Sequence, residues 1–310
     1  MIPLLRMNDN FNDEKVRNLN WKITAEHEGM LIKEYLQQIQ GFSRRILRSV
    51  KFSGGAILKN GQPVTVRQVL AAGDELTVVF PPEKRGSHLT GEDIPLDIVH
   101  EDEDIMVLNK PAGMVTIPSM LHPTGTMANA LIGYYERQGL TYTVHVVTRL
   151  DRDTSGLLLV AKHRFSHSLL FEKQKEGNVN RSYYALVEGK LKTDVATIEA
   201  PIAKKETSMI EREVVAGGKR AVTHYQVIRQ TDGGSLVDVR LETGRTHQIR
   251  VHFSHIGHPL MGDDLYGGHK DKIGRQALHC KTLAFQHPAT GEYLEFYAPM
   301  PEDMKKLLEE

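Results

Sequence analysis

The sequence has little cysteine, no net charge and no long apolar run, and each shortage excludes a class of protein. The single Cys280, set among apolar neighbours, cannot build a disulfide framework or a thiolate metal site, so we expect a small core residue in a reducing compartment. Lys plus Arg equal Asp plus Glu at 39 each, so any basic surface must be local. No apolar run approaches the roughly 18 residues that span a bilayer, and residues 1–15 lack a signal-peptide core. We expect a cytoplasmic protein without membrane association.

Four segments follow one another along the chain. Residues 1–20 are polar and rich in Asn and Asp, which is typical of a loosely ordered lead-in. Residues 21–80 have the pattern of a small domain, and residues 81–90, which begin with two prolines, are typical of a linker. In residues 91–310 the expected strands outnumber the helices and come largely in hairpins. We therefore expect an α+β domain with a mixed, mostly antiparallel sheet and flanking helices.

The small domain has helix signals followed by hairpin signals. Ser43 is a good N-cap for a helix, and Asn60–Gly61 is a strong hairpin turn. The periodicity predicts two helices and two strands, over residues 30–39, 44–51, 56–59 and 75–79. This order resembles the small RNA-binding domain of a ribosomal small-subunit protein, the alpha-L fold.

Basic side chains gather on the second of these helices. Arg44, Arg48 and Lys51 share a helical face, and Arg45 adjoins them. Between residues 21 and 86 there are ten Lys or Arg residues against six Asp or Glu residues, although the whole chain is neutral. A solvated helix face is the alternative interpretation, but the local excess favours phosphate contact. We therefore expect this helix to bind RNA.

The most distinctive stretch is a charged loop followed by a strand, at residues 146–160. Four apolar residues after Gly156 are typical of a strand that is buried on both faces. The residues before them place two carboxylates and two guanidiniums at the rim of that sheet. There Asp151 can be held rigidly and still reach a substrate. A solvated turn with incidental salt bridges is the alternative.

A second charged cluster, at residues 241–252, offers a partner for Asp151. Thr246 can cap a helix whose apolar stripe leaves Arg250 on a neighbouring face with His247. An isolated buried carboxylate is very costly, and a paired arginine is the usual remedy. We expect Arg250 to lie against Asp151 and to keep it ionised at neutral pH.

Other chemistries have weaker support. His247, His252 and His255 invite a metal site, but their spacing does not place all three on one helix face. Polar packing or RNA contact is the better interpretation of these histidines. Ser155 lacks the G-x-S-x-G turn of serine hydrolases, and the sequence has no Gly-rich phosphate loop of the Walker or dinucleotide type. We expect no metal and no cofactor.

Four motifs occur in a specific order: Asn109–Met114, Arg149–Gly156, a strand led by Tyr183, and Gly244–His252. Together they resemble the pseudouridine synthase family that modifies large-subunit ribosomal RNA, in its branch with an added N-terminal RNA-binding domain. The resemblance covers residues 21–300. It implies the pseudouridine synthase fold for the catalytic domain, RNA as the partner, and catalysis without a cofactor.

The resemblance also implies roles for single residues. Asp151 falls on the essential aspartate, which attacks the nucleotide so that uracil detaches, turns and rejoins through carbon. Tyr183 falls on the tyrosine that stacks under the uracil and has been proposed to act as a base. Arg250 falls on the arginine that pairs with the aspartate, and Arg149 on the one that helps fill the gap left by the flipped nucleotide. The expected substrate-binding residues are Arg149, Arg245, His247, Lys110, Arg44, Arg45 and Arg48.

Thr148 is a departure from the family, because many members have histidine at this position. That histidine is not the nucleophile, so we expect activity to survive and the surroundings of the flipped base to differ.

We expect a monomeric enzyme that acts on ribosomal RNA. Two alternatives stay open: the same chemistry on transfer RNA, and a catalytically silent RNA-binding or ribosome-assembly factor. Retention of Asp151, Tyr183 and Arg250 together speaks against the silent factor, and the basic N-terminal domain favours a large structured RNA.

Overall fold

The computed structural model of the chain describes residues 17–83, 85 and 89–309. These residues form two compact units. The first contains the described residues up to 85 together with 135–143, and the second contains 89–134 and 144–309. Among the described helices, none combines the length and the apolar character needed to cross a membrane.

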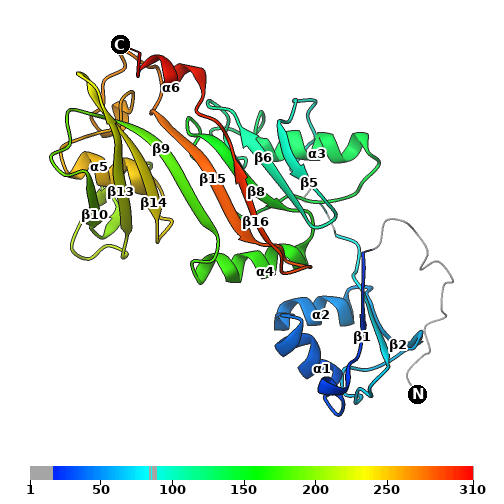
Figure 1. The fold of residues 1–310 in the computed structure, drawn as a ribbon. Helices are drawn as coiled ribbons and strands as arrows, with labels where there is room; N and C mark the ends of the chain where they lie inside the picture. Colours follow the sequence, from blue (N-terminus) through cyan, green and yellow to red (C-terminus); the bar gives the residue numbers. More distant parts are fainter. Residues whose placement is uncertain (1–16, 84, 86–88, 310) are drawn as a thin grey trace. The chain divides into compact units, whose positions relative to one another are not determined.

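The first unit is a small antiparallel sheet with short helices (Figure 1). Its strands lie in the order β1 (Asn18–Lys22), β4 (Glu75–Val79), β2 (Ala56–Lys59) and β3 (Gln62–Pro63). The helical segments are η1 (Ala25–His27), α1 (Ile32–Glu34), the π-helical η2 (Tyr35–Ile39) and α2 (Arg44–Phe52). β1 begins inside the expected lead-in, whose residues 1–16 lie outside the described part.

The local signals of this unit act as expected. Ser43 caps α2, since its Oγ accepts a hydrogen bond from the backbone N–H of Ile46 at 3.2 Å. Asn60 and Gly61 both have positive φ, at 51° and 75°, which is the backbone that a tight two-residue hairpin requires. The buried side of α2 packs on the sheet and leaves its arginines exposed.

The second unit is built on a large mixed sheet (Figure 1). The strands follow the order β10 (Val195–Glu199), β13 (Val222–Gln230), β14 (Gly234–Leu241), β9 (Asn180–Glu188), β15 (Leu278–Gln286), β8 (Ser155–Ala161), β6 (Ile105–Lys110) and β5 (Ile98–Glu101). β7 (His145–Val146) pairs with β8, and β16 (Tyr293–Tyr297) pairs with β15. β11 (Ile202–Lys204) and β12 (Arg212–Val214) form a separate hairpin. Among the described strands only β8 and β15 pair in parallel, so the expected mostly antiparallel α+β fold is confirmed.

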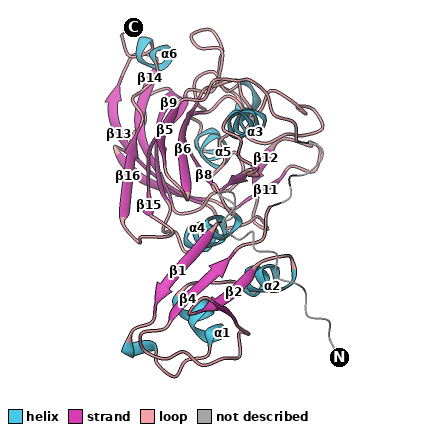
Figure 2. Cartoon of the chain, turned by 90° about the vertical axis from the view of Figure 1, so that its right-hand side faces the viewer, coloured by secondary structure: helices cyan, strands magenta, loops and turns pink. Residues whose placement is uncertain are grey.

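Helices cover both faces of this sheet (Figure 2). They are α3 (Met127–Arg137), α4 (Arg164–Lys175), α5 (Gln248–His255), the short η3 (Asp264–Tyr266) and α6 (Glu302–Lys306). On one face, Leu170 of α4 and Phe253 of α5 join the core that contains Leu159 of β8. On the other face, Met304 of α6 packs against Leu186 of β9. Because both faces are covered, β8 is buried along its whole length, as its apolar run predicts.

Candidate active site

The parallel pairing of β8 with β15 fixes the position of the Asp151 loop. Gly156 lies opposite Cys280 in the register and has a φ of 110°. A Cβ on Gly156 would lie 2.2 Å from the carbonyl oxygen of Cys280, so only glycine fits here. The loop therefore enters β8 at one defined point beside β15.

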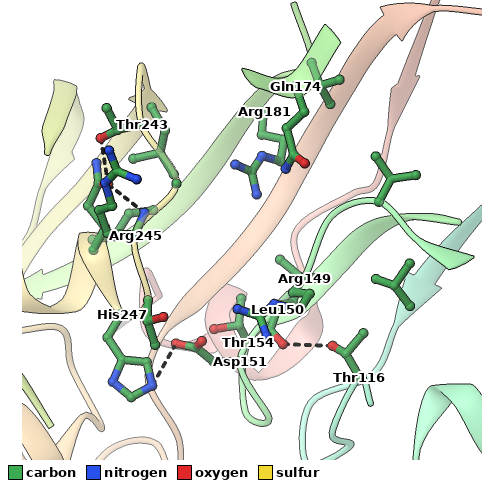
Figure 3. Close-up of a pocket in the computed structure, with 18 of the residues that line it drawn as sticks. Thr116, Arg149, Leu150, Asp151, Thr154, Gln174, Arg181, Thr243, Arg245 and His247 are labelled. Carbon is green, nitrogen blue, oxygen red and sulfur yellow. Dashed lines mark hydrogen bonds and ion pairs between the residues drawn. The ribbon is translucent and has the colours of Figure 1, made fainter. Parts of the chain in front are cut away.

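Side-chain hydroxyls anchor the residues that precede Asp151 in the loop. The Oγ1 of buried Thr148 accepts a hydrogen bond from the backbone N–H of Leu159 at 2.9 Å. The Oγ1 of Thr116 donates to the carbonyl oxygen of Leu150 at 2.9 Å (Figure 3). The side chain of Leu150 is buried, whereas that of Asp151 keeps 28% of its surface exposed. The carboxylate is thus the part of a rigid loop that stays accessible.

Arg250 of α5 joins the Asp151 loop to Asp263. Its Nη1 donates to Oδ2 of Asp151 at 3.2 Å, so the expected pairing of these two residues is present. Its Nε and Nη2 donate to the two carboxylate oxygens of Asp263, each at 2.7 Å. Burial opposes the charge on Arg250, but these two carboxylates outweigh it and hold the pKa of the guanidinium above its ordinary value. The arginine therefore presents a fixed positive charge to Asp151.

Asp263 is a partner of Arg250 that the sequence analysis did not identify. Its side chain is 1% exposed, and a carboxylate buried so deeply needs a cationic partner. The sequence signal that could have indicated a second acid was the need of Arg250 for further hydrogen-bond acceptors. A planar guanidinium on a buried helix face has more donors than one aspartate can accept.

His247 faces Asp151 with one ring nitrogen and Tyr266 with the other. It is the N-cap of α5, in place of the expected Thr246, and adopts a left-handed backbone with a φ of 58°. Its Nε2 lies 3.8 Å from Asp151 Oδ2, and its Nδ1 lies 2.7 Å from the hydroxyl of Tyr266. That hydroxyl accepts from the backbone N–H of Arg212 at 2.9 Å, and its own proton is available to Nδ1 of a neutral ring. In that tautomer the ring proton is on Nε2, which faces Asp151.

Burial controls the protonation of two aromatic groups at the site. It lowers the pKa of His247, against the opposing influence of Asp151, so the ring is neutral at pH 7. It raises the pKa of Tyr183 above its ordinary value. Tyr183 lies on β9, opposite Cys280 of β15, and is 4% exposed. A buried neutral phenol is suited to contact a base through its ring.

These groups share one cavity of about 810 Å³, a volume typical of ligand sites. Figure 3 shows Arg245 and Thr243 on one side of Asp151, Thr116 on the opposite side, and Arg181 on a further element. The six Lys or Arg residues in its lining outnumber the two acids, Asp151 and Glu242; the cations are Arg149, Arg152, Lys175, Arg181, Arg245 and Arg250. The cavity is therefore suited to an anionic ligand that brings an uncharged ring.

The expected substrate-binding residues have different locations. Arg149, Arg245 and His247 line the cavity with Asp151, Tyr183 and Arg250. Arg44, Arg45 and Arg48 are exposed on α2 of the first unit.

Lys110 was expected to bind substrate, but its side chain is fully buried and does not line the cavity. Its ammonium group donates to the carbonyl oxygens of Pro111, Met114 and Arg152 at 2.8, 2.8 and 2.9 Å. Burial lowers the pKa of Lys110 to about 7, opposed by Asp153 and Asp151. No sequence pattern indicates this placement, since lysine is almost never fully buried. Lys110 joins β6 to the Asp151 loop from inside the protein.

Among the described residues, His247, His252 and His255 are not brought together as possible metal ligands. His252 is buried, and its two ring nitrogens lie 2.8 Å from Thr223 Oγ1 and 2.9 Å from the carbonyl oxygen of Ala200. This is polar packing of the kind the sequence favoured. His255, by contrast, is exposed.

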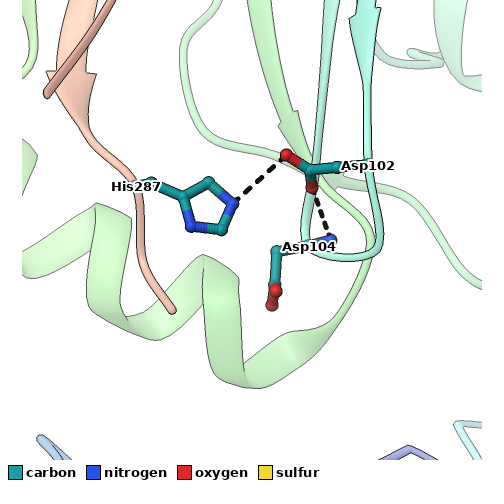
Figure 4. A group of neighbouring side chains, drawn as sticks. All are labelled: Asp102, Asp104 and His287. Atoms are coloured by element: carbon teal, nitrogen blue, oxygen red, sulfur yellow. Dashed lines mark hydrogen bonds and ion pairs between the residues drawn. The ribbon is translucent and has the colours of Figure 1, made fainter. Parts of the chain in front are cut away.

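A separate group of possible metal ligands comprises Asp102, Asp104 and His287 (Figure 4). Asp102 Oδ1 accepts from the backbone N–H groups of Asp104 and Ile105 at 2.7 and 2.9 Å. Its Oδ2 lies 2.9 Å from Nε2 of His100 and 3.2 Å from Nε2 of His287. Protein donors reach both oxygens of Asp102, whereas the buried Nε2 of His287 makes no hydrogen bond within the described part of the chain.

The sequence around the site matches a known family. Residues 104–255, which include Asp151, Tyr183 and Arg250, match the model of the RNA pseudouridylate synthase family. The uncharacterized RNA pseudouridine synthase YjbO of Bacillus subtilis (strain 168) is 51% identical over 279 residues, which are 90% of this chain and 98% of that protein. Ribosomal large subunit pseudouridine synthase D of Escherichia coli (strain K12) is 38% identical over 267 residues, 82% of each chain.

A solved structure gives the same result for the fold. Human RNA Pseudouridylate Synthase Domain Containing 1 superimposes with a TM-score of 0.56 at 25% identity, covering 73% of this chain and 96% of the human one. The aligned relatives and the shared fold agree with the motifs around Asp151. The chain belongs to the RNA pseudouridine synthase family.

Proposed function

We propose that the chain isomerises uridine to pseudouridine in large-subunit ribosomal RNA, with Asp151 as the nucleophile and the target base flipped into the cavity. The observation that carries this proposal is the placement of Asp151. Its carboxylate is half-buried in the wall of a cavity of about 810 Å³ and lies 3.2 Å from the guanidinium of Arg250. An ionised carboxylate held in this way can attack without rearrangement of its surroundings.

The reaction needs only groups of this kind. Attack by the carboxylate on the nucleotide breaks the bond between N1 of uracil and C1′ of the ribose. The detached uracil turns within the cavity, and its C5 then bonds to C1′ while the carboxylate departs. One proton leaves C5 and one is gained at N1, so the product is an isomer of the substrate. Neither an oxidant nor a transferred group from another molecule is required.

Tyr183 is proposed to be the platform for the turning base. Its ring lines the cavity beside Asp151, and burial keeps its phenol neutral. A phenol whose pKa is raised holds its proton at pH 7, which supports a stacking role over that of a resting general base. Arg149, exposed at the cavity rim, is proposed to occupy the space that the flipped nucleotide leaves.

The choice of ribosomal RNA has two supports. The Escherichia coli relative is named for the large ribosomal subunit and aligns over 82% of this chain. The exposed arginines of α2 add phosphate contacts on a unit separate from the catalytic one, which is useful on a large RNA. Action on this RNA would place the protein in the cytoplasm.

Pseudouridine mapping of ribosomal and transfer RNA tests the proposal. A host strain without the gene is compared with strains that carry the wild type, Asp151→Asn or Asp153→Asn. Asp153 is the matched control, because it is an acid of the same loop whose side chain pairs with the neighbouring Arg152. We expect one or a few large-subunit sites to lose the modification, and wild type and Asp153→Asn to restore it.

Asp151→Asn should bind the RNA and leave those sites unmodified. Restoration by Asp151→Asn would remove the nucleophile from the proposal. Loss of signal in transfer RNA alone would keep the chemistry and overturn the substrate. No change at any site would favour the silent binding factor.

A further inference from the structure

The loop between β6 and α3 carries two apolar side chains that stand in solvent. Met120 is 99% exposed and Leu121 is 77% exposed. Single exposed apolar residues are common on protein surfaces and carry little meaning alone. Here the two are adjacent, and the loop that presents them is stiff and begins at the active-site cavity.

The tip of this loop is a closed turn. Ser119 and His122 exchange both backbone hydrogen bonds, at 3.0 and 3.1 Å, and Ser119 Oγ accepts a further one from the N–H of His122 at 3.2 Å. Proline precedes and follows this pair, at positions 118 and 123, and restricts the backbone on both sides. A tip that is already ordered loses little conformational entropy when it binds.

The base of the loop belongs to the active site. Ile117 lines the cavity, and Thr116 donates to the carbonyl oxygen of the residue before Asp151 (Figure 3). Met120 follows Ile117 by three residues, so at most about 11 Å of backbone separates it from the cavity wall. A ligand seated in the cavity and continuing beyond its rim reaches the tip.

The composition of the loop indicates which part of such a ligand it contacts. No Lys, Arg, Asp or Glu occurs between Pro111 and Thr126, whereas the cavity lining is rich in arginine. The cavity is thus suited to the backbone of a nucleic acid, and the tip to its uncharged bases. Methionine and leucine are among the side chains that proteins insert between base steps to unstack them.

We propose that Met120 and Leu121 form an apolar wedge that packs against the bases flanking the target uridine in the substrate RNA. This inference rests on the proposed function, because it requires the target nucleotide to enter the cavity. The wedge replaces the stacking that the neighbouring bases lose when the target leaves the helix. Because the wedge contacts the flanking bases outside the cavity, it favours RNA in which those bases are unpaired or easily unpaired.

The test compares the double variant Met120→Ser/Leu121→Ser with the matched control Met209→Ser/Ile210→Ser. Met209 and Ile210 are likewise adjacent and exposed, at 86% and 54%, but they do not line the cavity. The substrate is an in vitro transcript of the host's unmodified large-subunit ribosomal RNA. We measure kcat/KM, the dissociation constant and its dependence on salt, and the melting temperature of each variant.

We expect the wedge variant to lose roughly tenfold or more in kcat/KM and in affinity, since burial of a methionine or leucine side chain contributes at least that much. The salt slope and the melting temperature should stay as in the wild type, because no phosphate contact and no core contact is removed. The control should match the wild type, and Met120→Leu/Leu121→Met should restore activity. Wild-type kcat/KM in the serine variant, an equal loss in the control, or a reduced salt slope would overturn the wedge.

Two further measurements distinguish the wedge from a failed nucleophile and from self-association. The same substitutions in the Asp151→Asn background should weaken RNA binding by the same factor. If Asp151→Asn proves active while the wedge effect stays, the nucleophile fails and the wedge stands. Sedimentation addresses self-association: a wild-type dimer that the serine variant dissociates would assign the tip to a second copy of the chain and overturn the RNA contact.

Discussion

Arg250 and Asp263 form a two-point ion pair, with both hydrogen bonds at 2.7 Å and both side chains buried. The third nitrogen of the same guanidinium reaches Asp151 at 3.2 Å. Asp263 does not line the cavity, but it fixes the orientation of the guanidinium that faces Asp151, the proposed nucleophile. A flexible cation at this position would be a weaker support for catalysis.

Asp263→Asn should lower kcat by about 100-fold, the typical effect of misplacing a catalytic group by about an ångström. It should also lower the free energy of unfolding by about 3–5 kcal/mol, because a buried arginine loses one partner. Single-turnover kinetics and urea unfolding measure the two effects. Asp264→Asn is the matched control, an exposed acid next in sequence, and should be near wild type in both. Wild-type kcat in Asp263→Asn would mean that Asp151 alone positions Arg250.

The contrast between these two aspartates shows what the sequence could reveal. The pairing of Arg250 with Asp151 was predictable, because both belong to distinctive motifs and a buried charge needs an opposite charge. The role of Asp263 was not, since no local pattern shows which acid the chain folds back onto α5.

The backbone conformation at the start of α5 could not be predicted from the sequence for a similar reason. Local propensity favours Thr246 as the helix cap and gives no reason for a left-handed histidine, so the backbone of His247 depends on tertiary contacts with Tyr266. The strand β8 was predictable, because it has an apolar run of strand length. Its parallel pairing with β15 was not predictable, because the register between two strands depends on both segments.

Tyr266→Phe should change the pH dependence of the reaction. Tyr266 donates to Nδ1 of His247 only when that nitrogen carries no proton, so the bond favours the neutral ring. Burial already lowers the pKa of His247, and the loss of this bond should raise it again. The acid limb of kcat/KM should therefore move to higher pH, with the largest loss of activity below pH 7. Tyr225→Phe, a buried tyrosine that does not line the cavity, should leave the profile unchanged. An unshifted limb in Tyr266→Phe would show that His247 does not control it.

His279 should make the fold sensitive to acid. It lies within hydrogen-bond distance of Ser155 Oγ, at 2.9 Å, and burial lowers its pKa from 6.5 to about 4. Between these values the unfolded chain binds the proton and the native state does not. Stability contributed by this group is therefore complete above pH 6.5 and falls as the pH drops toward 4, by up to about 3 kcal/mol.

Urea unfolding between pH 7 and 4 measures this contribution. His279→Gln should be less stable than the wild type at pH 7 and should lose less stability on acidification. His255→Gln, an exposed histidine, should follow the wild-type curve. If the free energy of unfolding falls equally with pH in the wild type and in His279→Gln, the acid sensitivity arises from carboxylates instead.

Arg44→Ser/Arg48→Ser should weaken RNA binding through phosphate contacts. Both side chains are exposed on α2, whose buried residues Ile46, Leu47 and Val50 hold the helix in the first unit, so its fold should persist. Each lost phosphate contact should reduce the slope of log affinity against log salt by roughly one. Lys33→Ser/Arg67→Ser removes two exposed cations of the same unit outside α2 and is the matched control. A slope reduced by about two in the first variant alone would locate the contact on α2. Equal reductions in both would mean that only the net charge of the unit matters, and no reduction in either would mean that α2 does not touch phosphate.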